Sequence, residues 1–219
     1  MAEIVTVPDL FLVGGELLSS DGRNGFVKIH HQQGELDRAC AMYSIAMCLL
    51  YENIVSDLDA PGQGNGGRLL RNLYSNYGII KSGFFFDKLY KIILEYKRKT
   101  WRVDYYGEGT PKECIERICG EIDNGVAPIV GIGYVGCKDG HALLGVGYEK
   151  EEGKVVRIYC LDPGAPTPIT SIWNSYLDVR DLRKSSIYVN NNTKCEPQKV
   201  RIQDFIIIEN LEEVPITQL

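Results

Sequence analysis

Gln32-Gln33-Gly34-Glu35-Leu36-Asp37-Arg38-Ala39-Cys40 leads directly into Ala41-Met42-Tyr43-Ser44-Ile45-Ala46-Met47-Cys48-Leu49-Leu50, and this change from a polar to an apolar stretch is the most informative feature of the chain. The second stretch contains good helix formers and neither glycine nor proline, so it predicts a buried helix that runs to about Ile54. Asp37 can accept hydrogen bonds from first-turn N–H groups and is the expected N-cap. Cys40 would then lie in the first turn, where the helix dipole and free N–H groups favour a thiolate.

A cysteine at the start of a helix is a candidate nucleophile, although most cysteines only pack in protein cores. Nucleophilic catalysis also requires a base, a group that orients the base, and donors for an oxyanion. These groups have to be found elsewhere in the chain before Cys40 can be given a catalytic role.

The composition excludes several classes of protein. A formal net charge of −5 over 219 residues argues against nucleic acid or an anionic membrane as the main partner. The seven cysteines form no CxxC pair and there are only three histidines, so we expect no metal site. No signal peptide is evident and the apolar runs are too short to cross a bilayer, which predicts a cytoplasmic protein with reduced thiols.

The periodicity of apolar residues changes along the chain. Residues 30–124 are mainly helical in pattern and residues 125–210 are strand-like, which predicts one α+β domain over residues 1–219, with a helical lobe and an antiparallel sheet lobe. In the helical part, Thr110 and Pro111 predict the start of a helix, and Gly125 follows its end. The expected helices cover residues 38–54, 68–76, 84–99 and 111–124, and the expected strands cover residues 26–29, 101–106, 126–130, 142–148, 155–159, 186–189 and 200–208.

A hairpin supplies the partners that Cys40 requires. His141 begins one predicted strand, the turn lies at residues 149–153, and Asp162 ends the next strand. Antiparallel pairing about this turn brings His141 into the neighbourhood of Asp162. A carboxylate beside an imidazole fixes its tautomer and stabilises the imidazolium that forms when a thiol is deprotonated.

Two glycine patterns imitate a dinucleotide fingerprint, one from Gly62 to Gly67 and one from Gly131 to Gly136. The first follows a proline turn and the second leads into a strand, so neither has the strand–loop–helix context that the fingerprint requires. We therefore expect no nucleotide site.

The motifs together resemble papain-like cysteine peptidases. They are Gln-Gly-x-x-Asp-x-x-Cys before an apolar helix, then Gly-His-Ala-Leu-Leu-Gly-Val-Gly-Tyr, a turn, and Leu-Asp-Pro-Gly. The chain is most similar, over about residues 30 to 165, to the bacterial domain that trims double-glycine leaders from bacteriocin precursors. The resemblance implies a papain-like fold in which a helical lobe carries the nucleophile and packs on an antiparallel β-sheet lobe.

The resemblance also implies roles for single residues. Cys40 would be the nucleophile, His141 the general base and acid, and Asp162 the orienting group. The family places an oxyanion-binding glutamine six residues before the cysteine, where this chain has Gly34, so Gln33 is favoured and Gln32 stays open. Ala41-Met42 replaces the usual Gly-Pro or Gly-Ser, and the N–H of Cys40 would be the second oxyanion donor.

The same comparison implies where a substrate would bind. Papain-like enzymes hold an extended substrate on a Gly-Gly backbone edge, which Asn65-Gly66-Gly67 resembles, although a mobile surface loop is the alternative for this glycine-rich segment. Gly140, directly before His141, is a further expected substrate contact.

The sequence thus predicts a cysteine peptidase or isopeptidase that acts on a peptide or protein, with no cofactor. A transglutaminase-like acyl transferase would use the same order of Cys, His and Asp. A peptide-binding pseudoenzyme is the third reading, favoured by the displaced glutamine and by Ala41-Met42. The oligomeric state is not predicted.

Overall fold

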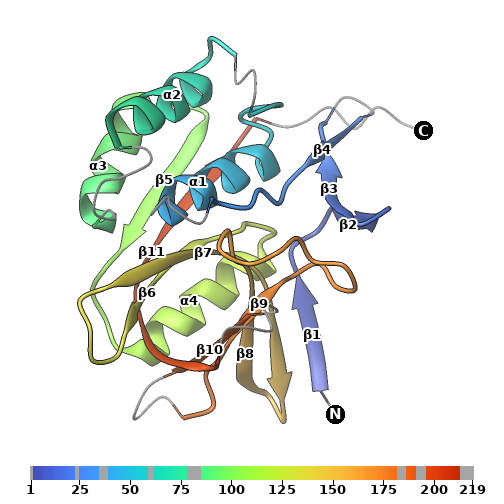
Figure 1. The fold of residues 1–219 in the computed structure, drawn as a ribbon, viewed down its shortest axis with the longest axis vertical. Helices are drawn as coiled ribbons and strands as arrows, with labels where there is room; N and C mark the ends of the chain where they lie inside the picture. Colours follow the sequence, from blue (N-terminus) through green and yellow to red (C-terminus); the bar gives the residue numbers. More distant parts are fainter. Residues whose placement is uncertain are drawn as a thin grey trace.

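The computed structural model describes residues 2–22, 25–34, 39–58, 62–77, 85–181, 186–190 and 196–212. Within these ranges the chain forms a large antiparallel sheet, a small antiparallel sheet and four helices (Figure 1). This arrangement confirms the predicted α+β class.

The large sheet closes on itself as a barrel. Its strands within the described residues are β1 (Ala2–Thr6), β5 (Trp101–Tyr106), β6 (Ile129–Tyr134), β7 (Gly140–Glu151), β8 (Lys154–Leu161), β9 (Ser175–Asp178), β10 (Ser186–Asn190) and β11 (Gln198–Asn210). Antiparallel pairing runs from β7 through β6, β11, β10, β9 and β8, and β8 pairs again with β7. Closure leaves these strands without free edges, which satisfies their backbone groups.

The two longest strands carry additional partners at their ends. β1 pairs with the second half of β7, and β5 pairs with the second half of β11. The sheet therefore contains strands from residues 2–6 and 101–106, in addition to the strands of the predicted sheet lobe.

Four helices pack on this sheet or on one another, namely α1 (Cys40–Tyr51), α2 (Asn65–Tyr77), α3 (Phe86–Tyr96) and α4 (Pro111–Asp123). α1 lies on β6 and β7, α3 lies on β5 and β11, and α2 packs between α1 and α3. α4 packs on β7, β11 and β1, in the lower part of Figure 1. One continuous apolar core joins α1 to the central strands, because nearly all of the helix is buried.

Local signals explain the ends of α4. Thr110 and Glu113 form a capping box, in which the Thr110 hydroxyl accepts a hydrogen bond from the Glu113 N–H and the Glu113 carboxylate accepts one from the Thr110 N–H. Pro111 occupies the first turn, and Gly125 has a φ of +83° after the helix end. The predicted boundaries of this helix are confirmed.

α1 differs from its prediction at both ends. It begins at Cys40, with Ala39 at the N-cap position and no side-chain hydrogen bond to the cap, and it ends at Tyr51. Asn53, directly after the C-cap residue Glu52, has a φ of +54°, which no α-helical residue adopts, so the helix does not reach Ile54. Asp37, the expected N-cap, lies outside the described residues.

The hairpin of β7 and β8 turns at Glu152 and Gly153, which both have positive φ, as a two-residue hairpin loop requires. Its register has two irregularities, after Gly145 and after Glu149, and Leu144 pairs with Leu161. The two irregularities compensate each other, so Leu144 and Leu161 keep the register that the turn sets, and the hairpin brings His141 to Asp162 as predicted.

The strands before residue 30 were largely absent from the sequence prediction. β2 (Leu10–Val13), β3 (Glu16–Ser20) and β4 (Phe26–Lys28) form the small sheet. Only β4 matches a predicted strand, the one expected over residues 26–29.

Candidate active site

The nucleophile candidate stands where α1 meets the barrel. Cys40 is the first residue of the helix, and its side chain is partly buried. One turn further along, the buried Ser44 hydroxyl donates to the carbonyl of Ala142 at 3.1 Å. Ala142 follows His141 in β7, so this hydrogen bond fixes the helix start beside the strand that carries the base.

His141 joins the thiol to a carboxylate. Its Nε2 lies 2.5 Å from Oδ1 of Asp162, and its ring is hydrogen-bonded to the Cys40 thiol. Because Nε2 faces the carboxylate, Nδ1 is the nitrogen left for the sulfur. The structure therefore brings Cys40, His141 and Asp162 together in the predicted order.

The carboxylate of Asp162 is almost fully buried, with 1% of the side chain exposed, and it accepts several hydrogen bonds. The N–H of Gly164 donates to Oδ1 at 2.7 Å. Tyr188 donates its hydroxyl to Oδ2, and Asn190 donates its side-chain amide to the same oxygen at 3.4 Å. Both residues belong to β10, which no local signal in the sequence relates to Asp162.

The backbone of Asp162 is held as firmly as its side chain. Oδ1 of Asn174 accepts from the Asp162 N–H at 2.7 Å, and its Nδ2 donates to the Asp162 carbonyl at 2.9 Å. Nε2 of the buried His30 ring lies 3.0 Å from the same carbonyl oxygen, and its Nδ1 lies 3.1 Å from the hydroxyl of Thr167. Burial lowers the pKa of His30, so we assign it a neutral, supporting role.

The electrostatics of the site favour an ion pair between thiolate and imidazolium. Burial by itself raises the pKa of the Cys40 thiol. This effect is outweighed by the hydrogen bond and charge of His141 and by the N–H groups of Ala142 and Ala41, so the pKa of the thiol is lowered. Burial opposes the charged form of His141 too, yet Asp162 and Cys40 raise its pKa. The pKa of Asp162 is lowered despite burial, chiefly by His141. These opposite shifts are those of an activated nucleophile and its base.

Gln33 reaches the same cleft as Cys40 and His141. Its N–H donates to the carbonyl of Pro163 at 2.8 Å, directly after Asp162, and its side-chain Oε1 is buried without a hydrogen-bond partner. Gln32 is exposed. The geometry thus places Gln33, and not Gln32, where a side-chain amide could meet a substrate oxygen.

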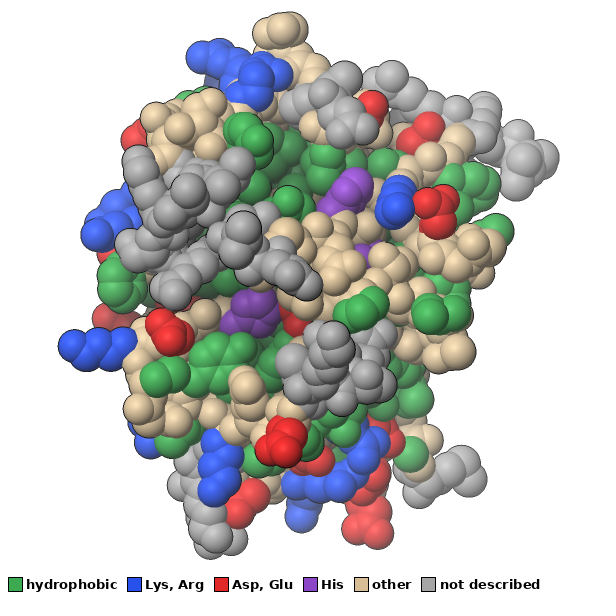
Figure 2. Space-filling model, viewed as in Figure 1, with side chains coloured by type: hydrophobic (Ala, Val, Ile, Leu, Met, Phe, Trp, Pro, Cys, Tyr) green, Lys and Arg blue, Asp and Glu red, His purple; other side chains and the backbone are tan. Residues whose placement is uncertain are grey.

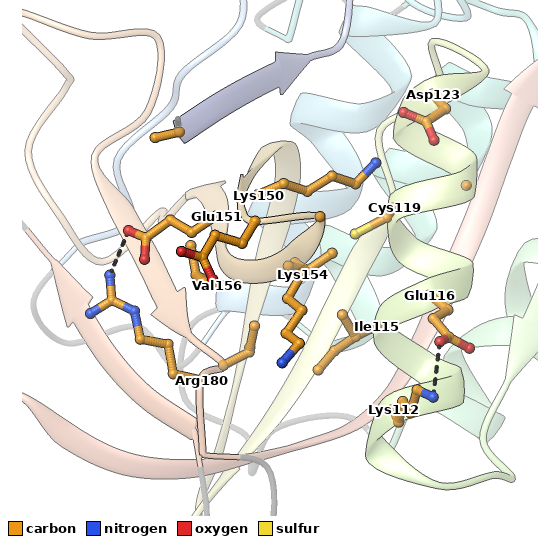
Figure 3. Close-up of a pocket in the computed structure, with 16 residues that line it drawn as sticks. Lys112, Ile115, Glu116, Cys119, Asp123, Lys150, Glu151, Lys154, Val156 and Arg180 are labelled. Atoms are coloured by element: carbon orange, nitrogen blue, oxygen red, sulfur yellow. Dashed lines mark hydrogen bonds and ion pairs between the residues drawn. The ribbon is translucent and has the colours of Figure 1, made fainter.

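A cleft with a volume of about 690 Å³ extends from the candidate catalytic residues along β6 and β11. Gly140 borders it, as expected. In the view of Figure 2, hydrophobic and histidine side chains lie near the centre of the face, and most charged side chains lie toward its margins.

The structure does not bring Gly66 and Gly67 to this cleft. Both are buried in the first turn of α2, and a side chain at Gly66 would meet Ile54 at 2.6 Å. Gly66 therefore permits close packing of α2 against the end of α1, and the predicted Gly-Gly substrate edge is wrong. Neighbouring residues 59–61 lie outside the described residues.

Two kinds of feature are absent from the part of the chain that the structure describes. Its histidine, cysteine and acidic side chains form no group of three or more that could hold a metal ion. None of its helices has the length and apolar character that a membrane span needs.

Comparisons with known proteins give one family. The model of the Peptidase_C39 like family matches residues 26–184, a range that includes Cys40, His141 and Asp162. No curated protein matches the chain. Among solved structures, UfSP from C. elegans is similar at 14% identity and a TM-score of 0.42, over 95% of this chain and 34% of that one, so this chain spans about a third of its length. The family match covers well over half of the sequence, and the chain therefore belongs to the Peptidase_C39 like family.

Proposed function

We propose that this protein hydrolyses a peptide or isopeptide bond through Cys40, His141 and Asp162. The observation that carries the proposal is the continuous hydrogen-bonded connection from a buried carboxylate through His141 to a thiol at a helix start. Membership of a cysteine-peptidase-like family supports it. The cytoplasmic location expected from the sequence is part of the same proposal.

The first half of the proposed reaction forms an acyl-enzyme on Cys40. The thiolate of Cys40 attacks the carbonyl carbon, and the C=O electrons move onto oxygen. In this proposal the oxyanion is bound by the N–H of Cys40, at the first position of α1, and by the side-chain amide of Gln33, which lines the same cleft. His141 then gives its proton to the leaving amine, the C–N bond breaks, and a thioester remains on Cys40.

The second half releases the acid product. His141, now neutral, takes a proton from water as the water attacks the thioester. The C–S bond then breaks, and the thiolate of Cys40 is regenerated beside the imidazolium. Asp162 keeps its negative charge throughout and stabilises the charged ring of His141.

The test uses a library of acetylated, amidated decapeptides in which every position varies over all amino acids except cysteine. We expect new amino termini after incubation with the wild type and none with Cys40→Ala, as detected by mass spectrometry. Cys114→Ala, a cysteine of α4 outside the site, is the matched control and should cleave the same peptides.

Other outcomes separate the alternatives. Products that incorporate added methylamine in place of water would identify an acyl transferase. Binding of peptides without cleavage by the wild type would contradict the proposed hydrolysis and identify a peptide-binding protein.

A further inference from the structure

A carboxylate in the wall of the cleft has no role in the proposed chemistry. Asp204 lies in β11 at a register irregularity, opposite Gly131 of β6, and both residues border the cleft. A Cβ atom at Gly131 would overlap the carboxylate of Asp204. The side chain of Asp204 therefore lies across the neighbouring strand, in space that only a glycine leaves free.

This carboxylate has no cationic partner in the described chain. No lysine or arginine among the described residues forms an ion pair with Asp204, and the hydroxyl of Tyr105, 3.4 Å from Oδ2, is its hydrogen-bond donor. Burial raises its pKa to about 6, the Tyr105 hydroxyl lowers it, and the nearby Asp87 raises it. A partly buried carboxylate beside a second acid gains from an added positive charge, because each unpaired charge is costly away from water.

The surroundings of Asp204 fit a long cationic side chain. A carbon atom of the Phe86 ring lies 3.2 Å from the Cβ position of Gly131, so an apolar side chain that borders the cleft adjoins the carboxylate. Lysine and arginine bury an aliphatic stem on apolar surface while their charged ends pair with an acid.

The strand register gives the distance between Asp204 and the strand that carries His141. Asp204 pairs with Gly131, which pairs with Ala142, the residue after His141. Two strand spacings amount to about 10 Å. An extended peptide covers this distance in about three residues.

We propose that Asp204 selects substrates that carry a lysine or arginine side chain within about three residues of the scissile bond. The inference rests on the proposed function, because it assumes that the cleft beside Cys40 holds a peptide. Arg201 also borders the cleft, but its side chain is exposed and makes no ion pair with Asp204. Substrate selection by Arg201 would favour acidic peptides, so the two residues give opposite expectations.

The test separates binding from hydrolysis. Immobilised Cys40→Ala protein is incubated with the same decapeptide library, and retained peptides are sequenced by mass spectrometry. We expect lysine or arginine to be enriched at one position by about tenfold or more, as for a charge-assisted contact. Two peptides made from the retained consensus, one with lysine and one with norleucine at that position, then give individual dissociation constants.

Substitution of the carboxylate identifies its role. Asp204→Asn in the Cys40→Ala background should weaken binding of the lysine peptide by about tenfold or more and change binding of the norleucine peptide by less than about threefold. The unchanged norleucine affinity also shows that the variant is folded. Asp87→Asn, which removes the neighbouring negative charge outside the cleft wall, should keep the preference for lysine.

Several results would overturn the inference: no retained peptide, no enrichment of basic residues, enrichment of acidic residues, or a lysine preference that survives Asp204→Asn. Failure of the proposed function gives a different result. In that case the lysine peptide binds through Asp204, but the wild type does not cleave it.

Discussion

Asp162 is the residue on which most contacts of the site converge. Its side chain meets His141, Gly164 and Tyr188, and its backbone is bound on both sides by Asn174. A carboxylate fixed in this way can orient an imidazole without moving itself during turnover.

Asp162→Asn should therefore preserve the fold and lower kcat by about a thousandfold or more, because an amide favours the wrong imidazole tautomer and cannot stabilise imidazolium. Asp139→Asn is the matched control. The side chain of Asp139 is exposed and precedes His141 by two residues, so its loss should change kcat by less than about threefold. Steady-state kinetics on one cleaved peptide tests both variants, and an equal loss in the two would contradict the assignment of Asp162.

The thiols of the chain should differ in reactivity. Burial raises the pKa of Cys48, Cys114, Cys119 and Cys160, whereas the pKa of Cys40 is lowered by His141. Limited iodoacetamide treatment followed by peptide mapping should label Cys40 before these four. The labelling rate of Cys40 should stay high below pH 9, because its thiolate is already present there. The exposed Cys137 serves as a reference thiol. His141→Ala should slow labelling at Cys40 alone, and unchanged labelling would contradict the proposed ion pair.

At the scale of secondary-structure elements, the start of α1 and the β6–β11 pair shape the cleft. At the N-cap position of α1, Ala39 makes no side-chain hydrogen bond, so no side-chain cap takes up the first-turn N–H groups beside Cys40. Gly131 leaves a gap between the side chains of β6, and the carboxylate of Asp204 from β11 occupies this gap.

Gly131→Ala should destabilise the protein by about 1 to 3 kcal/mol, because the added methyl overlaps Asp204 and lies 3.2 Å from Phe86 within packed strands. Gly120→Ala provides the contrast. Gly120 lies in α4 with no atom within 4 Å of the added methyl, so this change should stabilise by up to about 1 kcal/mol through helix propensity. Urea denaturation monitored by circular dichroism measures both, and equal effects would contradict the packing at Gly131.

At the scale of the whole molecule, Glu52 connects two distant parts of the chain. It follows α1, and its Oε2 accepts a hydrogen bond from the N–H of Asn210 at the end of β11, at 3.0 Å. Burial raises the pKa of Glu52 to about 7 from an ordinary value of 4.5, although the Asn210 N–H and Arg102 lower it.

This raised pKa makes stability depend on pH. A carboxyl group whose pKa is higher in the folded state contributes most stability below pH 4.5, and that contribution is lost as pH rises from 4.5 through 7. Glu52→Gln cannot ionise, so its stability relative to the wild type should increase by about 2 to 4 kcal/mol between pH 4.5 and pH 8. Glu95→Gln, at an exposed position of α3, should show no such trend. Urea denaturation at several pH values measures the difference, and parallel pH profiles for wild type and Glu52→Gln would refute the burial of this charge.

Local chemistry in the sequence was sufficient for the elements with strong signals. Thr110 and Pro111 marked the start of α4, and the apolar run after Cys40 marked α1. The hairpin between His141 and Asp162 was predictable because its two strands are adjacent in sequence. The candidate triad followed from these local features together with the family resemblance.

Only the tertiary structure decided the rest, because it depends on pairing between segments far apart in the chain. Barrel closure brings Tyr188 to Asp162, and the pairing of β6 with β11 brings Asp204 to Gly131. Neither short strand patterns nor single glycines encode such partners. The same limitation explains the error at Gly66, whose use in close packing against Ile54 depends on how α2 meets α1.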